Sequence, residues 1–246
     1  MNPLVRSAKA GKTEKQEGEN PFWISYADLM TALMVLFLVA LTVALFAVTQ
    51  TTAEVQEQKA ERQEEIADFM ALLKQLTANY PGITLRGSTI DFGERARFPS
   101  NSHQLNTEQI RLLREFVPEV LRLARTPIAA RWLKRITVIG YADPRGSYLY
   151  NLNLSLQRSA RVICTLLAPL PEIASLSEVD RMQVRQLFIV SGASFNAQKT
   201  SLEASRRIEL RLEFFEAEES PAPDAAGVNL APPRQDDETP CPLDQR

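Results

Sequence analysis

The stretch LMTALMVLFLVALTVALFAV, residues 29–48, runs for 20 residues without a charged side chain. A helix of this length is about 30 Å long, which matches the hydrocarbon thickness of a bilayer. The apolar character begins at Pro21, so we expect a membrane-spanning helix over residues 21–49. A secretory signal peptide is the alternative, but the run is long and ends in AVTQ (47–50) rather than in a small-residue cleavage site.

The charges on either side of this segment predict its orientation. Residues 1–20 carry four Lys or Arg, whereas residues 51–70 carry two Lys or Arg and six acidic residues. Because positively charged flanks stay in the cytoplasm, we expect residues 1–20 there and all residues after the span in the periplasm. The sequence therefore predicts a single-pass protein of the bacterial inner membrane.

Composition excludes several classes of function. The 246 residues have a formal net charge of −2, which argues against a strongly basic nucleic-acid binder. One histidine and two cysteines are too few for a multi-histidine metal centre or a cysteine zinc site. Neither a phosphate-binding G-x-x-x-x-G-K-[ST] nor a G-x-S-x-G motif occurs, and we find no nucleophile–base set. We therefore expect neither an enzyme nor a bound cofactor, and no nucleic-acid partner.

The pattern of apolar and polar residues divides the rest of the chain into three segments. Residues 50–82 are expected to form a helical linker. Six of the eight positions on one heptad stripe are apolar, namely Val55, Ile66, Phe69, Leu73, Leu76 and Tyr80, and the other two are Lys59 and Arg62. Such a stripe suits either a short parallel coiled coil between two copies or an amphipathic helix lying on another surface. Residues 83–215 alternate strand and helix patterns, which predicts an α/β sandwich. Residues 216–246 hold eight acids and six prolines, so we expect a solvated, disordered tail.

Within the α/β region, a helix is expected over residues 151–167. Its apolar stripe comprises Leu156, Ala160, Ile163, Cys164 and Leu167. Cys164 is therefore expected to be a core residue, while Cys241 lies in the acidic tail. A disulfide between the two is the less favoured alternative, and the sequence alone does not decide it.

One carboxylate lies inside the apolar segment. Asp28 follows Pro21 by seven residues, and Thr31 lies one helical turn further on, on the same face. A charged group at this depth is costly and usually marks an ion path. The alternative is that Asp28 lies at the cytoplasmic headgroups and only marks the membrane edge.

The segment YADLMTALM (26–34) resembles the Y-A-D-x-M-T-A-x-M signature of MotB, the B subunit of flagellar stators. The resemblance implies that Asp28 carries the transported ion, H⁺ or Na⁺, with Thr31 as its neighbour. It also implies a polytopic membrane partner of the MotA/ZorA type. Two B subunits would form a homodimer through the transmembrane helix, the linker and the periplasmic domain, and ion flow would drive rotation of a ring of A subunits.

Two further segments, GYADPRG (140–146) and NLNLSLQR (151–158), resemble the G-x-T-D-x-x-G and N-x-x-L-S-x-x-R-A motifs of OmpA-like peptidoglycan-binding modules. SRRIE (205–209) is similar to their closing N-R-R-V-E motif. The resemblance covers residues 83–214 and implies that peptidoglycan is a partner.

This resemblance also implies which residues hold the wall. Peptidoglycan stem peptides carry diaminopimelate, which has both an amino group and a carboxylate. Asp143 would take the ammonium, and Arg158 would bind the carboxylate through parallel hydrogen bonds. Asn151, expected at a helix N-terminus, favours the same anion, and Tyr150 and Leu154 would supply an apolar wall. The alternative is that Asp143 and Arg158 form a structural ion pair.

Two kinds of ion-driven motor use such a subunit. NPFWIS (20–25) and the long apolar run are more similar to the B subunits of the Zorya anti-phage system (ZorB) than to flagellar MotB. This favours a peptidoglycan-anchored motor subunit that serves anti-phage defence. A flagellar stator subunit is the alternative. A passive tether between inner membrane and cell wall, with Asp28 inert, is a further one.

Overall fold

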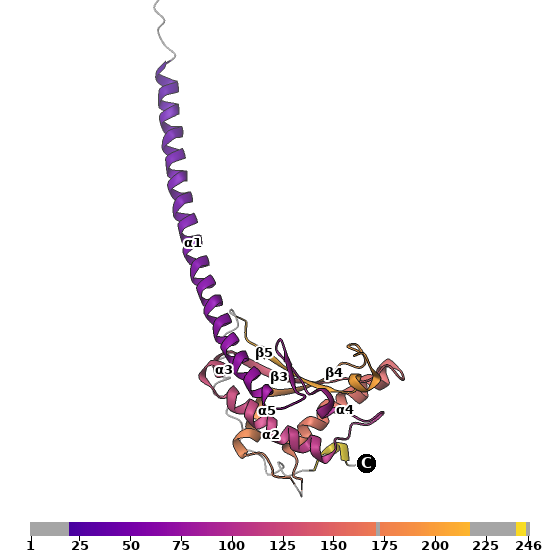
Figure 1. Ribbon diagram of the computed structural model, residues 1–246. Helices are drawn as coiled ribbons and strands as arrows, with labels where there is room; N and C mark the ends of the chain where they lie inside the picture. The colour runs from indigo at the N-terminus through magenta and orange to yellow at the C-terminus, as the bar shows by residue number, and fades with distance from the viewer. Residues whose placement is uncertain (1–19, 171–172, 217–239, 245–246) are drawn as a thin grey trace, which may run out of the picture. The chain divides into compact units, whose positions relative to one another are not determined.

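The computed structural model describes residues 20–170, 173–216 and 240–244 (Figure 1). The chain divides into two compact units, Met1–Glu57 and Gln58–Arg246, which we describe separately. Apart from Asn20, the segment expected in the cytoplasm, residues 1–20, lies outside the described residues.

In the first unit, the described residues belong to helix α1, which extends from Asn20 to Ala78 and so continues into the second unit. Within the described residues, α1 is the one helix long and apolar enough to cross a membrane. Its hydroxyl groups are satisfied within the helix, since Thr42 Oγ1 donates to the carbonyl of Val39 (2.8 Å) and Thr49 Oγ1 to that of Phe46 (2.9 Å). Polar groups in a bilayer need such internal partners, so this pattern suits a spanning helix.

The second unit is built on a five-stranded mixed sheet. Its strands are β1 (Thr84–Arg86), β2 (Thr89–Asp91), β3 (Leu133–Gly140), β4 (Phe188–Gly192) and β5 (Ile208–Phe214). They are ordered β1-β2-β5-β3-β4, and only the β3–β4 pair is parallel among these strands. Along β5, apolar residues alternate with charged residues. The apolar residues Ile208, Leu210 and Leu212 are buried in the core.

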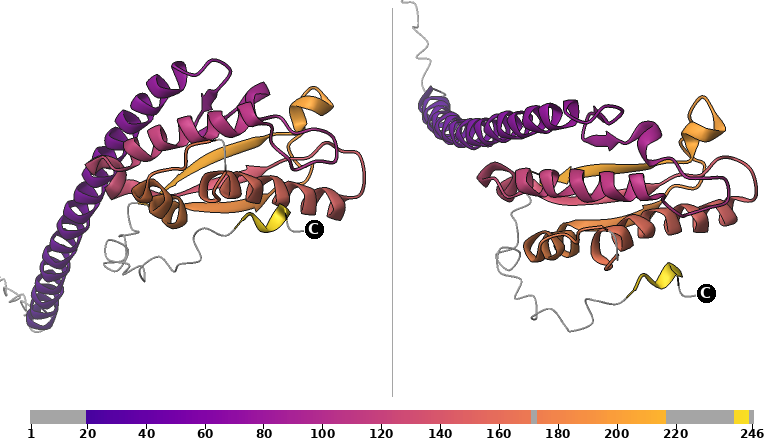
Figure 2. Two further views of the ribbon diagram at one scale, coloured as in Figure 1. Left: turned by 90° about the horizontal axis from the view of Figure 1, so that it is seen from below. Right: turned by 60° about the horizontal axis from the view of Figure 1, so that its bottom comes forward.

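Helices α2 (Thr107–Ala124), α4 (Tyr148–Leu167) and α5 (Glu178–Leu187) cover one face of this sheet. The shorter elements are α3 (Pro127–Trp132), α6 (Leu202–Ser205) and the 3₁₀ turns η1 (Gly93–Ala96) and η3 (Pro242–Asp244). Figure 1 shows α2, α4 and α5 below the sheet, and in the left view of Figure 2, which looks from below, they lie in front of it. Asn106 starts α2 with a capping box, because its Oδ1 accepts from Gln109 N (2.8 Å) and its N–H donates to Gln109 Oε1 (2.9 Å). The expected architecture, an apolar helix followed by an α/β sandwich, is confirmed.

The last turns of α1 complete the core of this unit. Phe69 and Leu73 are buried, and the Phe69 ring packs edge-on against Phe214 with centroids 6.0 Å apart. Tyr80, just after the helix, packs in the same way on Phe116 at 5.1 Å. The apolar stripe from Phe69 onward therefore packs on the protein's own domain. Of the two alternatives for this stripe, the structure shows an amphipathic helix that lies on another surface, and not a coiled coil between two copies.

Helix α4 buries a different face from the one that the sequence predicted. Ser147 caps it, and its fully buried positions include Ser155, Arg158 and Ser159, whereas Leu156 is 40% exposed. The same buried face also holds Leu154, Val162 and Leu166, and near its start two strand-end glycines, described below, let Ser155 approach the sheet. The prediction that Leu156 begins a buried stripe was therefore wrong.

Residues 240–244, the last described residues of the chain, are linked to α4. Cys164 and Cys241 form a disulfide with a Cα–Cα distance of 5.3 Å. Next to it, Arg161 binds Asp244 through two hydrogen bonds of 2.6 and 2.9 Å. The expectation of an unpaired core cysteine was therefore wrong, and the expected solvated tail does not include residues 240–244. The tail's other residues, 217–239 and 245–246, lie outside the described residues.

We expect Leu73→Ala to destabilise the domain by roughly 2–5 kcal/mol, because it leaves a cavity under the last turns of α1. Leu72→Ala, at a neighbouring position that is 41% exposed, is the matched control and should change stability by about 0.5 kcal/mol or less. Denaturant unfolding of the full-length protein in detergent measures both. Equal losses for the two variants would show that the helix is not packed on the sheet as described.

Candidate functional site

The first candidate site lies on α1. A shallow apolar groove runs along one stripe of the helix, lined by Asp28, Thr31, Ala32, Val35, Leu36 and Val39. These positions recur every three or four residues, so they form one continuous face. The hydroxyl of Thr31 donates to the carbonyl of Ala27 one turn earlier, which leaves its oxygen lone pairs available as acceptors beside Asp28.

The second candidate site lies where β3 ends and α4 begins. Gly140 ends β3 so close to α4 that a Cβ there would come within 2.0 Å of the Ser155 carbonyl oxygen. Gly192 ends the neighbouring strand β4, where a Cβ would come within 2.7 Å of the Leu156 side chain. Only glycine permits this approach, which explains the glycine that opens the 140–146 motif. As a result, the loop that carries Asp143 lies directly against α4.

Arg158 projects from α4 into the interior, where it is 0% exposed. Its guanidinium donates to three backbone carbonyls, those of Tyr141 (2.7 Å), Ser102 (2.9 Å) and Pro99 (3.1 Å). Burial, together with the nearby charge of Arg206, lowers the pKa of Arg158 to about 10, so it still carries its charge at neutral pH. Arg158 thus joins the end of β3 to the loop before α2.

Asp143 is surrounded by positive charge. Its Oδ2 accepts from Arg145 Nη2 (2.7 Å) and from Arg206 Nη1 (3.1 Å), while its Oδ1 accepts from the Nε and the backbone N–H of Arg145, both at 3.1 Å. The hydrogen bonds from the Arg145 side chain are the main cause that lowers the pKa of Asp143 to about 2, against the opposing effect of burial. The carboxylate is therefore ionised at any physiological pH.

The ion-pair partners of Asp143 differ from the one considered in the sequence analysis, which was Arg158. Among the contacts of the described residues, Asp143 pairs with Arg145 and Arg206, and no ion pair joins it to Arg158. The guanidinium of Arg158 is buried and bonded to three backbone carbonyls, so its direct part in binding stays a prediction. Arg145 and Arg206 were missed, although both lie inside the quoted motifs.

The remaining expected site residues have distinct positions. Asn151 is buried one turn inside α4 rather than at its N-terminus, and its side-chain amide donates to the carbonyl of Arg145 (2.8 Å). It therefore shapes the loop instead of presenting a helix end. Tyr150 is half exposed beside the loop, whereas Leu154 is only 6% exposed and lies behind the site surface.

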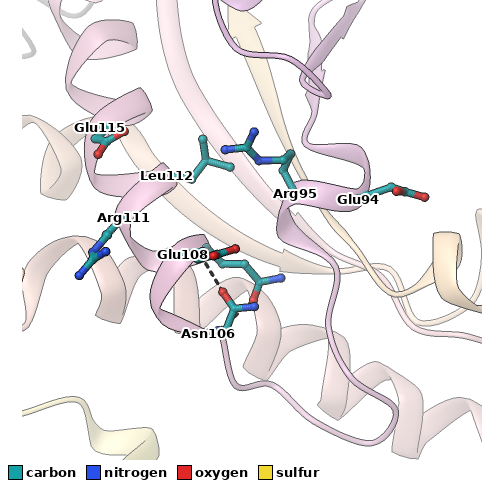
Figure 3. A pocket seen from close by; sticks show the side chains of 8 residues that line it. Glu94, Arg95, Asn106, Glu108, Arg111, Leu112 and Glu115 are labelled. Atoms are coloured by element: carbon teal, nitrogen blue, oxygen red, sulfur yellow. Dashed lines mark hydrogen bonds between the residues drawn. The ribbon is translucent and has the colours of Figure 1, made fainter.

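A polar hollow of about 580 Å³ lies elsewhere, between η1 and the start of α2. Figure 3 shows Arg95 facing α2, while Glu94 and Arg111 point away from the hollow. Acidic and basic side chains alternate around it and do not converge on one point. Within the described residues, no group of three or more His, Cys, Asp or Glu side chains is placed to hold a metal ion. The Asp28 and Asp143 regions therefore stay the two candidate sites.

Comparisons with known proteins identify the family of the chain. Residues 6–62 match the family model described as membrane MotB of the proton-channel complex MotA/MotB. The Zorya protein ZorB of Escherichia coli O139:H28 (strain E24377A / ETEC) is 42% identical over 210 residues, covering 83% of this chain and 85% of that protein. The chain belongs to the ZorB family. The family assignment makes it a MotB-like B subunit, as the resemblance of residues 26–34 implied.

Solved structures similar to this ZorB-family chain have low sequence identity. The OmpA-like domain of FopA1 from Francisella tularensis subsp. tularensis SCHU S4 is 18% identical with a TM-score of 0.34, covering 55% of this chain and 82% of that chain. A periplasmic domain of Helicobacter pylori MotB is 15% identical with a TM-score of 0.39, covering 55% of this chain and 88% of that chain.

We expect Arg145→Gln to raise the pKa of Asp143 from about 2 toward its ordinary value of 3.8. A carboxyl whose pKa is lowered by folding stabilises the protein above its unfolded pKa, and this contribution is lost as the pH falls through the folded pKa. The stability difference between wild type and Arg145→Gln should therefore be full near pH 5 and shrink toward pH 2. Thermal unfolding of both proteins across this range measures it. A difference that stays constant down to pH 2 would contradict the assignment.

Proposed function

We propose that the chain is the ion-carrying, peptidoglycan-anchored B subunit of a Zorya anti-phage motor. The observation that carries this proposal is Asp28, a lone carboxylate on the apolar face of a helix whose next 20 residues are uncharged. The 42% identity to ZorB over most of both chains favours defence over flagellar rotation.

The ion path needs a partner. A carboxylate facing lipid is costly, and one helix cannot enclose a path for an ion. The stripe of Asp28, Thr31 and the small and apolar residues that follow suits close packing by the helices of a polytopic MotA/ZorA-type subunit. In this arrangement Asp28 takes up and releases the ion, and the Thr31 oxygen supplies a second ligand. Both H⁺ and Na⁺ can bind to such a pair of oxygens.

A second copy of the chain belongs to this assembly. The homodimer would form through the transmembrane helix, the linker and the periplasmic domain. Because the apolar stripe from Phe69 to Tyr80 is used within each domain, linker contacts between copies fall before Phe69, where Val55 is 42% exposed.

The outer domain holds the cell wall. Asp143 stays ionised and offers its negative charge to the ammonium of a peptidoglycan stem, and the guanidinium groups around it suit the neighbouring carboxylate. A fixed anchor keeps the B subunit from turning with the part that it drives.

The disulfide supports a periplasmic location for this domain. Structural disulfides form in oxidising compartments such as the periplasm and are rare in the cytosol, where thiols stay reduced. The Cys164–Cys241 bond therefore agrees with the charge asymmetry around the span, which places residues 1–20 in the cytoplasm.

Phage plating on cells that carry the native operon tests the ion-carrier role. We expect Asp28→Asn, which keeps the shape and removes the charge, to abolish protection at equal expression. Asp68→Asn, the same change at an exposed site on α1 beyond the apolar stretch, is the matched control and should keep protection. If the Asp28→Asn variant still protects the cells, the ion-carrier role is contradicted and the passive-tether alternative is supported. A wild-type chain that protects against no phage but restores swimming to a stator-deficient strain would indicate a flagellar subunit.

Thiol labelling tests the orientation. In Cys164→Ser, the freed thiol of Cys241 should react with a membrane-impermeant maleimide in spheroplasts. Ser7→Cys in a cysteine-free background is the control and should react only after lysis, because residue 7 is expected in the cytoplasm. The reverse pattern would show that the outer domain faces the cytoplasm.

A further inference from the structure

Arg145 occupies the place on Asp143 that a ligand's ammonium would need. Its side chain makes two hydrogen bonds to the carboxylate, from Nη2 (2.7 Å) and from Nε (3.1 Å). The other two guanidinium groups near Asp143 are held inside the protein, since the Arg206 side chain is 10% exposed and Arg158 is fully buried. The side chain of Arg145 is 54% exposed, so it is the one of the three that can leave.

The backbone of the loop does not depend on that side chain. The Asn151 amide binds the Arg145 carbonyl (2.8 Å), and the Arg145 N–H binds Asp143 Oδ1 (3.1 Å). Gly146 completes the turn with a positive φ of 96°. Apart from Asp143, the guanidinium donates to the Ser100 hydroxyl (3.0 Å), which is also at the surface. Arg145 can therefore swing away by side-chain rotation alone, with Asp143 kept in position.

We propose that Arg145 is an exchangeable internal cation that makes this site selective for zwitterionic ligand groups. This inference rests on the proposed wall-binding function of Asp143. The ammonium of an amino-acid centre replaces the Arg145 guanidinium on Asp143, and the released guanidinium binds the carboxylate of the same centre. The recognised chemistry is thus one carbon bearing both an ammonium and a carboxylate, as at the free end of a diaminopimelate side chain.

The charge balance of the site explains the selectivity. Asp143 and Glu203 are negative, and Arg145, Arg158 and Arg206 are positive, so the site carries a net charge of +1. A zwitterion adds no net charge and leaves every displaced group with a partner. A simple amine would displace Arg145 without offering it a new partner, and would add positive charge to a site that is already positive.

Two probes that differ only in this carboxylate test the inference. They are muropeptide stem tripeptides whose third residue is either meso-diaminopimelate, with both charges at its end, or lysine, with the ammonium alone. Calorimetry on the full-length protein in detergent gives their Kd values. We expect the wild type to prefer the diaminopimelate peptide by about tenfold or more, the order expected for one charge-assisted contact.

The decisive variant is Arg145→Gln. It should weaken binding of the diaminopimelate peptide by about tenfold and leave the lysine peptide equal or tighter, so that the preference disappears. Arg145→Lys should keep part of the preference, because it retains the charge without the planar fork. Arg111→Gln, which removes an exposed arginine of α2, is the matched control and should change neither Kd.

The outcomes separate this inference from the function on which it rests. A loss by the same factor for both peptides, or no change for either, in Arg145→Gln would overturn the exchange and leave wall binding intact if Asp143→Asn still abolishes binding. A wild-type chain that binds neither peptide, or an Asp143→Asn variant that binds as the wild type does, would overturn the wall-binding proposal and the exchange together.

Discussion

The close approach of α4 to the ends of β3 and β4 is the constraint on which the outer domain depends. Gly140 and Gly192 leave no room for a side chain, so the helix backbone and its small residues press directly on the sheet. This brings the Arg158 guanidinium under the loop, where an unpartnered charge would be very costly. Three carbonyls from two separate segments satisfy it. The Arg158 guanidinium thus holds two backbone segments together. One of them is the end of β3, which leads directly into the loop that carries Asp143.

The chain holds two carboxylates in opposite physical settings. Asp143 lies among guanidinium groups that keep its pKa near 2, so its charge is permanent, as an anchor requires. Asp28 lies on a stripe of otherwise apolar side chains that includes the hydroxyl of Thr31, and its proposed role is to carry the transported ion. The two proposed roles, ion transport at Asp28 and wall binding at Asp143, therefore use the same residue type in two different surroundings.

Local patterns predicted much of this structure. The uncharged run of residues 29–48 predicted the long apolar helix, and the Asn106 capping box and the alternation along β5 are likewise determined by neighbours within a few residues. The contacts that were not predicted include the local pair of Asp143 and Arg145, two residues apart, but most join distant segments. Asp143 meets Arg206 across 63 residues, and Cys164 meets Cys241 across 77. The buried face of α4 was misjudged because it combines apolar residues such as Val162 and Leu166 with polar ones, Ser155 and Arg158, that pack at two distant strand-end glycines and a loop.

The disulfide has a mechanical consequence for a domain proposed to lie between a motor and the cell wall. It closes a covalent ring of the chain from Cys164 to Cys241 that contains α5, β4 and the central strand β5. A load between α1 and the proposed wall contact at Asp143 acts on the chain that precedes this ring, so the 77 enclosed steps, about 260 Å of extended chain, lie outside the loaded path. If such a load pulled the earlier strands out of the sheet, β4 and β5 would remain covalently tied to α4.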